Sequence, residues 1–489
     1  MSRYGSVMTT VPDSTFIPPK YADRLHQLYD RATEEVIDAI RAKLGEGKKP
    51  KRLARPQVSV RDNGMAAISD APFMGHNGPV EYSSVLEPPW DDDAARAEGK
   101  FPPARFPALR SLLDFIRAEP EVWGSYMSAP HERIFEILVE GGVEDAANSH
   151  FLRFGETASS PKTRKSVLGP VLKSLLQPRL PTPVIIPIAL TRFARDGARL
   201  AEDALLIRMS EGLQRARWDN KARAANGHDA VLASATHALV LTTWSIANQP
   251  KWDLGQVLSA TEPAVTQMVD SFFAALRLEL GIATGYAQEI RLAKGWRSFR
   301  RLGEPEVYAV GARRYPAWFD DYGWTADPLP LVDKDGVNSV ARTWQALRSI
   351  DDNRFALALR RLNAAMTRDE PADAILDATI ALEVLLGDGD GQSISWKLRM
   401  RAAALIGIEA NREAMEEVRT AIRDTYEARS AIVHGGRRKK SASDDGGYAA
   451  SQTAIDVLRQ VLKALVRHPA YLDPLKIDAD LLLTSSLVV

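Results

Sequence analysis

An arginine and a histidine near the C-terminus carry the side chains of this sequence that best suit acid–base chemistry on a phosphate. They are Arg429 and His434, in the stretch DTYEARSAIVHGG at residues 424–436. Histidine transfers protons near pH 7, and a guanidinium binds two phosphate oxygens at once. RNA carries a 2′-hydroxyl that can attack the adjacent phosphate, so its cleavage needs no external nucleophile. The pair therefore suits chemistry on RNA.

The Arg-x4-His spacing alone is a weak signal. Eight histidines and a Lys and Arg fraction of 63/489 give about one such pair per chain by chance. A second pair with this spacing, Arg223 and His228, indeed occurs in RAANGH and contains the turn dipeptide Asn226-Gly227. We interpret this second pair as a coincidence.

Hydrophobic spacing places Arg429 on the apolar face of a helix predicted over residues 412–434. At about 100° per residue, Arg429 falls within roughly the same 60–80° arc as the apolar side chains. These apolar side chains are Met415, Val418, Ile422, Tyr426 and Val433. A buried guanidinium is costly unless it is paired, so Arg429 should pair with a buried acid or face a seam between proteins. A structural alternative makes Arg429 a satisfied ion and His434 a residue favoured by the helix dipole.

Five helices are predicted around this pair. They cover residues 353–367, 371–387, 393–406, 412–434 and 448–467. Pro371 suits a first helical turn, Ser393 can cap a helix, and Gly407 and Gly435 can end helices. The mostly short connections indicate an antiparallel helical bundle.

Three sequence blocks in this bundle resemble the Apea-like branch of the HEPN superfamily. They are AILDATIALEVLL (residues 374–386), ISWKLRMRAAALIG (394–407) and YEARSAIVHGG (426–436). They resemble, in order, the family's ALE-LL helix, its basic S-x-K-L-x-x-R helix and its closing R-S-x-x-V-H-G. The resemblance covers roughly residues 349–468, about a quarter of the chain.

The resemblance implies a metal-independent endoribonuclease that acts as a homodimer and needs no cofactor. The family's motif, which acts at a symmetric dimer interface, maps onto Arg429 and His434. His434 would be the general acid/base, and Arg429 would stabilise the phosphate and the transition state. The expected products end in a 2′,3′-cyclic phosphate and a 5′-hydroxyl. Many active members have Asn, Asp or His directly after the arginine, where this sequence has Ser430. Ser430 either forms a hydrogen bond to the phosphate or only caps the helix. Some members of the superfamily are non-catalytic.

Weaker candidates lie near the pair. Glu383 is the only charge between residues 380 and 387, so it should pair with a buried cation, in a structural or an orienting role. The cations considered are Arg429, Lys397, Arg399 and Arg401. Lys397 and Arg401 are also candidate RNA contacts. The basic run after His434 is either a solvated loop or an RNA-binding loop; it comprises Arg437, Arg438, Lys439 and Lys440. GDGDG at residues 387–391 lacks calcium-loop spacing and is interpreted as a helix connector.

Bulk composition predicts a globular protein of about two to four domains. With 63 Lys and Arg against 63 Asp and Glu among 489 residues, zero net charge argues against a nucleic-acid coat or a membrane-surface protein. The absence of cysteine excludes disulfides, thiolate metal sites and cysteine nucleophiles. Nothing in the first thirty residues resembles a signal peptide, and the most apolar window, residues 230–247, is interpreted as a buried helix. We expect a cytoplasmic protein without a membrane span.

A mainly α-helical chain of three regions is predicted. The regions are a helix with a loop-rich segment at residues 1–107, a mostly helical sensor region at 108–344 and the bundle at 345–489. In the first two, helices are predicted over 21–44, 198–214 and 263–280, and strands at 183–190 and 305–312.

By analogy with the family, the leading hypothesis is a toxin-like or anti-phage effector whose N-terminal two-thirds respond to a protein trigger or regulator. The rival hypothesis is a non-catalytic module that dimerises or binds RNA or nucleotides. A third hypothesis places chemistry in the middle region and predicts a deep pocket with convergent polar groups there.

Overall fold

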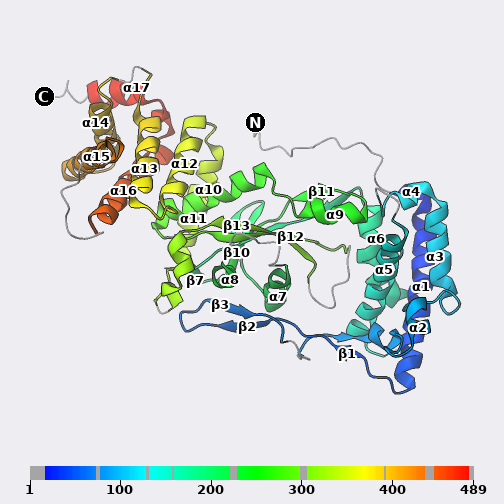
Figure 1. Cartoon of the computed structure of the whole chain (residues 1–489). Coiled ribbons are helices and arrows are strands. Elements are labelled where there is room, and N and C mark those ends of the chain that lie inside the picture. Colours follow the sequence, from blue (N-terminus) through cyan, green and yellow to red (C-terminus); the bar gives the residue numbers. More distant parts are fainter. Residues whose placement is uncertain are drawn as a thin grey trace.

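The chain forms an N-terminal helical body, a central antiparallel sheet and a C-terminal helical bundle (Figure 1). The structure is a computed structural model. It describes residues 17–72, 77–127, 131–156, 159–220, 228–297, 305–325, 327–389, 392–434 and 445–483. Helices predominate among the described elements, so the prediction of a mainly α-helical protein is confirmed at that level.

The N-terminal body has a single core, built mainly by four helices. They are α1 (Ala22–Gly45), α3 (Pro107–Ala118), α5 (Glu132–Phe154) and α6 (Pro161–Leu176). The chain between α1 and α3 contains β1 (Lys51–Arg52), β2 (Gln57–Val60), β3 (Ala66–Ser69), β4 (Val80–Glu81) and α2 (Asp93–Glu98). α1 matches the predicted first helix. Since α1 and α5 share this core, the body extends across the boundary expected between residues 107 and 108.

A six-stranded antiparallel sheet lies at the centre of the molecule, and its extent was not predicted. Its order is β13 (Val307–Arg314), β12 (Tyr286–Leu292), β6 (Val184–Pro187), β10 (His237–Leu241), β9 (Ala204–Arg208) and β8 (Gly197–Ala201). The predicted strands at 183–190 and 305–312 are confirmed as β6 and β13. Shorter elements of this region are α4 (Pro120–Trp123), β5 (Arg179–Pro181), β7 (Arg192–Phe193), α9 (Lys251–Leu258) and β14 (Leu331–Val332).

Two helix predictions in the middle region are wrong. Residues 198–214 form β8, β9 and the start of α7 (Glu211–Asp219), while residues 230–247 form α8 (Asp229–Ala233), β10 and β11 (Ser245–Ala247). All five residues of β10 are buried, because the strand is central and covered on both faces. An apolar run of this kind has no period by which a strand differs from a buried helix.

One core joins the sheet to the bundle. α10 (Pro263–Leu280), predicted correctly, and α11 (Lys334–Ser349) cover one sheet face and also pack on the bundle. α7 and α8 lie on the other face, between the sheet and the β2–β3 hairpin (Figure 1). In the bundle, Arg459 donates hydrogen bonds to the carbonyl oxygens of Arg277 (2.9 Å) and Leu278 (3.1 Å) at the end of α10. The boundary expected between residues 344 and 345 falls inside α11.

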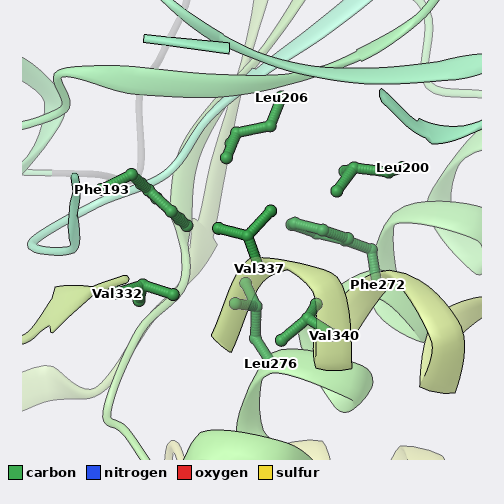
Figure 2. A pocket seen from close by; sticks show the side chains of 8 residues that line it. All are labelled: Phe193, Leu200, Leu206, Phe272, Leu276, Val332, Val337 and Val340. Atoms are coloured by element: carbon green, nitrogen blue, oxygen red, sulfur yellow. The ribbon is translucent and has the colours of Figure 1, made fainter. Parts of the chain in front are cut away.

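A small cavity between the sheet and α10–α11 is lined by apolar side chains only. Its volume is about 10 Å³, and Figure 2 shows its lining of Phe193, Leu200, Leu206, Phe272, Leu276, Val332, Val337 and Val340. This volume barely accommodates one water molecule, and the lining offers no polar group to hold it. This cavity therefore lacks convergent polar groups. A larger and more open cavity of about 490 Å³ in the same region is lined by Ala201, Glu202, Asp203, Thr243, Gln345 and Arg348, so the hypothesis of chemistry in the middle region stays a prediction.

The five predicted bundle helices are all present. They are α12 (Asn353–Ala365), α13 (Pro371–Leu386), α14 (Ile394–Ile406), α15 (Arg412–Val433) and α16 (Asp445–Arg467), followed by α17 (Pro474–Ile477). Pro371 begins α13 as predicted, but Ser393 has a φ of 52° and its side chain makes no capping hydrogen bond to α14. The arrangement places α15 against α14, α16 and α13.

Acid should destabilise the sheet through His237 in β10. Its ring nitrogens lie 2.9 Å from Thr236 Oγ1 and 3.0 Å from the Arg195 carbonyl oxygen, and burial, with nearby Arg208, lowers its pKa to about 4. The unfolded chain, whose histidine pKa is about 6.5, therefore binds more protons between these pH values. His237 should contribute a loss of about 2–3 kcal/mol in unfolding free energy as pH falls from 6.5 to 4.

Urea unfolding of the wild type and of His237→Asn, at pH 7 and pH 4.5, measures this contribution. The wild type should lose more free energy than the variant on acidification. Equal losses in the two proteins would show that His237 does not carry the pH dependence.

Candidate functional site

The C-terminal end of α15 carries Arg429, Ser430 and His434. Asn411 begins the helix by accepting a 3.0 Å hydrogen bond from the Ala414 N–H, and His434 ends it by donating its own N–H to the Ser430 carbonyl oxygen, also at 3.0 Å. α15 thus runs from Arg412 to Val433, one residue short of the predicted end, with His434 as its C-cap. It positions the three candidate residues on its last two turns.

This end of α15 is less buried than the apolar stripe of the sequence suggests. Val418, Ile422 and Thr425 are buried, whereas every side chain from residue 426 to 434 is at least partly exposed. Val433 leaves 52% of its surface exposed. The first half of the stripe packs in the bundle core, and the second half leaves an apolar helix end accessible.

Arg429 is half-buried, and its side chain makes no ion pair or hydrogen bond with any residue in the described part of the chain. Its guanidinium carbon lies 5.7 Å from the ring centroid of Tyr426. The expectation of a buried acidic partner is therefore wrong for the described residues. The other alternative, that Arg429 faces a seam between proteins, stays a prediction.

His434 is exposed, and its imidazole makes no hydrogen bond with a described residue. Five helical positions separate it from Arg429, which corresponds to about 140° around the helix and about 7.5 Å along its axis. α15 therefore brings the two side chains to the same helix end but not onto one face. Ser430 lies between them in the sequence and is half-buried. Its side chain makes no hydrogen bond with a described residue.

Glu383 does not pair with any of the four cations considered for it. It is half-buried on α13 and forms no ion pair with a described residue. The prediction that it pairs with Arg429, Lys397, Arg399 or Arg401 is wrong. Without such an ion pair, nothing in the described structure supports an orienting role for Glu383 at the candidate site.

Lys397 and Arg401 are occupied by ion pairs that join α14 to neighbouring segments. The Arg401 guanidinium donates from Nη2 to Asp388 Oδ2 (2.7 Å) and from Nε to Asp478 Oδ1 (2.8 Å). Its Nη1 donates to the Leu386 carbonyl oxygen at 2.6 Å. Lys397 Nζ lies 2.8 Å from Asp388 Oδ1. The Arg401 side chain is only 2% exposed, so these contacts are structural, and we do not retain Arg401 as an RNA contact. Neither aspartate was singled out in the sequence, although Asp388 lies in the GDGDG connector.

Some candidates lie outside the described residues. These are Arg437, Arg438, Lys439 and Lys440 of the basic run, and Arg223 of the second Arg-x4-His pair. His228 of that second pair is described, and its ring contacts the Tyr322 hydroxyl at 2.6 Å.

Known proteins provide no match to the chain: neither a family model, nor a curated protein sequence, nor a solved structure is significantly similar to it. None of the described helices combines the length and the apolar character needed to cross a membrane. In the same described residues, no cluster of three or more His, Asp or Glu side chains could hold a metal ion.

Proposed function

We propose that the protein is a metal-independent endoribonuclease of the HEPN type whose catalytic site forms where the ends of two α15 helices meet in a homodimer. The observation that carries this proposal is the state of Arg429. Arg429 is half-buried on a partly exposed apolar helix end, and its guanidinium has no acidic partner among the described residues. Such an arginine suits a surface completed by a second copy and an anionic ligand.

Each residue of the pair supplies one requirement of RNA cleavage. Arg429 has its N–H donors available to bind the scissile phosphate and to stabilise the charge that develops on it. His434, exposed to solvent, removes the 2′-hydroxyl proton or protonates the leaving 5′-oxygen. Because the two side chains diverge by about 140° on one helix, Arg429 acts most directly with His434 of the partner subunit.

The N-terminal two-thirds are proposed to regulate this site in response to a protein trigger, as in a toxin-like or anti-phage effector. This proposal is supported by the direct packing of the sheet against the bundle. The core that contains the sheet also contains the bundle, and Arg459 links α16 to the end of α10. A displacement of α10 would therefore be transmitted to the helix that packs beside α15.

A second candidate function is an RNA-binding module without catalysis. It is favoured by His434, whose imidazole has no hydrogen-bond partner in the described residues that would fix its tautomer. Arg429 would bind phosphate in the same way in such a module.

Cleavage of total cellular RNA by the purified full-length protein in EDTA tests the proposal. We expect fragments with 2′,3′-cyclic phosphate and 5′-hydroxyl ends from a dimeric protein. Substitution of the 2′-hydroxyl by hydrogen at the cleaved position of a model RNA should stop the reaction. Dependence on a divalent metal, or 5′-phosphate ends, would refute this mechanism. RNA binding by a folded dimer without cleavage, with and without candidate triggers, would support the binding module.

A further inference from the structure

We propose that Tyr426 is a positioning residue for Arg429: its ring holds the guanidinium so that the N–H donors remain directed to RNA phosphate. The inference rests on the proposed function, since it concerns the same site. It assigns a role to a side chain that contributes an aromatic ring and a hydroxyl group to the site.

The contact between the two side chains follows from the helix. Tyr426 and Arg429 are three residues apart on α15, a spacing at which side chains of a helix meet. The guanidinium carbon lies 5.7 Å from the ring centroid, within the range of a cation–π interaction. Tyr426 is half-buried and packs on the bundle core, so the ring itself is anchored. Arg429 is thereby connected to the core through an aromatic ring.

Two neighbouring arginines of α15 are paired with carboxylates and show how such a partner changes an arginine. Arg419 is paired with Glu416, and Arg423 with Asp424. Both carboxylates accept hydrogen bonds from the arginine N–H groups and neutralise the positive charge of the guanidinium. An aromatic ring attracts the cation through its quadrupole but is not a strong hydrogen-bond acceptor. The positive charge and the N–H donors of Arg429 therefore remain available to bind a phosphate. This is the partner that a phosphate-binding arginine requires.

Tyr426→Leu removes the ring, Tyr426→Phe retains it, and Tyr448→Leu is the matched control. Tyr448 is a 68% exposed tyrosine of α16, and in the described structure its ring is not in cation–π contact with Arg429. The readouts are kcat and KM for a model RNA, and the Kd for the same RNA with hydrogen at the cleaved 2′-position. Thermal unfolding identifies any variant that fails to fold.

Tyr426→Leu should lower kcat about tenfold, since small misplacements of catalytic groups have large kinetic effects, and should weaken RNA binding about threefold. Tyr426→Phe and Tyr448→Leu should stay within about twofold of the wild type. In an Arg429→Ala background, Tyr426→Leu should change the Kd no further, because the guanidinium it positions is gone.

Two results would overturn the inference while leaving the proposed nuclease intact. The first is a normal kcat for folded Tyr426→Leu when Arg429→Ala has lost cleavage. The second is an equal loss of RNA binding on Tyr426→Leu with and without Arg429, which indicates a structural effect. Full cleavage by Arg429→Ala would overturn the proposed function itself, and the inference with it.

Discussion

Replacing His434 with alanine should lower the rate of RNA cleavage about 10²- to 10⁴-fold, because the variant lacks the group that moves protons to and from the ribose and the leaving oxygen. Arg429→Ala should lower it about 10²- to 10³-fold by removing the charge that stabilises the transition state. Neither change should alter the fold, since His434 is exposed and Arg429 makes no ion pair in the described structure. Cleavage of a labelled RNA in EDTA provides the measurement.

The chain supplies matched controls for both substitutions. His468 is paired with Glu409, and Arg423 with Asp424 on α15 itself, so alanine at either position removes the same kind of side chain outside the candidate pair. Both controls should cleave RNA at nearly the wild-type rate. Rates for His434→Ala and Arg429→Ala that match these controls would exclude the pair as the catalytic residues.

Mixing the two inactive proteins tests whether the site is shared between protomers. If Arg429 acts with His434 of the partner subunit, a dimer of one Arg429→Ala and one His434→Ala protomer contains one intact site. Random exchange of subunits should then restore about a quarter of the wild-type activity. Continued inactivity after demonstrated exchange would place both residues of each functional pair in one protomer.

Arg401→Ala should lower the free energy of unfolding by about 3–5 kcal/mol. The substitution removes the Arg401 cation from Asp478, leaves Asp388 paired with Lys397 alone, and removes the donor to the Leu386 carbonyl oxygen. Its control is Arg399→Ala in the same helix, where the arginine is half-buried and its Nε donates only to the Ser395 carbonyl oxygen. Urea unfolding of both variants measures the difference.

The outcome also decides between two roles for Arg401. A loss near that of Arg399→Ala, together with weakened RNA binding, would restore Arg401 as an RNA contact and contradict the structural role. A large loss of stability with unchanged RNA affinity in the folded variant would establish the structural role.

The sequence predicted the bundle well because its helices are amphipathic and clearly bounded. Pro371 marks the start of α13, and the three- and four-residue spacing of α15 has no good β-strand alternative. The sheet was missed for the opposite reason. β10 is buried on both faces, and the β8–β9 hairpin turns at Glu202-Asp203 without a glycine or proline to mark it. Those residues fit a helix equally well until pairing partners are known.

The candidate site was predictable only in part. Spacing and the apolar arc drew attention to Arg429, but the identity of its neighbour depends on side-chain direction, which one sequence does not give. The same holds for Arg401, whose partners Asp388 and Asp478 come from a connector and from the segment after α17. Glu383 shows the reverse case, a charge in an apolar helix that is half-buried and forms no ion pair in the described structure.

The core shared by the sheet and the bundle also bears on the order of synthesis. The ribosome delivers α10 and α11 before any bundle helix, and the bundle completes its core only by packing on them. The proposed catalytic residues therefore emerge after the region that is proposed to regulate them. A truncated chain that ends early lacks the proposed nuclease site, and a fragment that begins at the bundle lacks part of its own core.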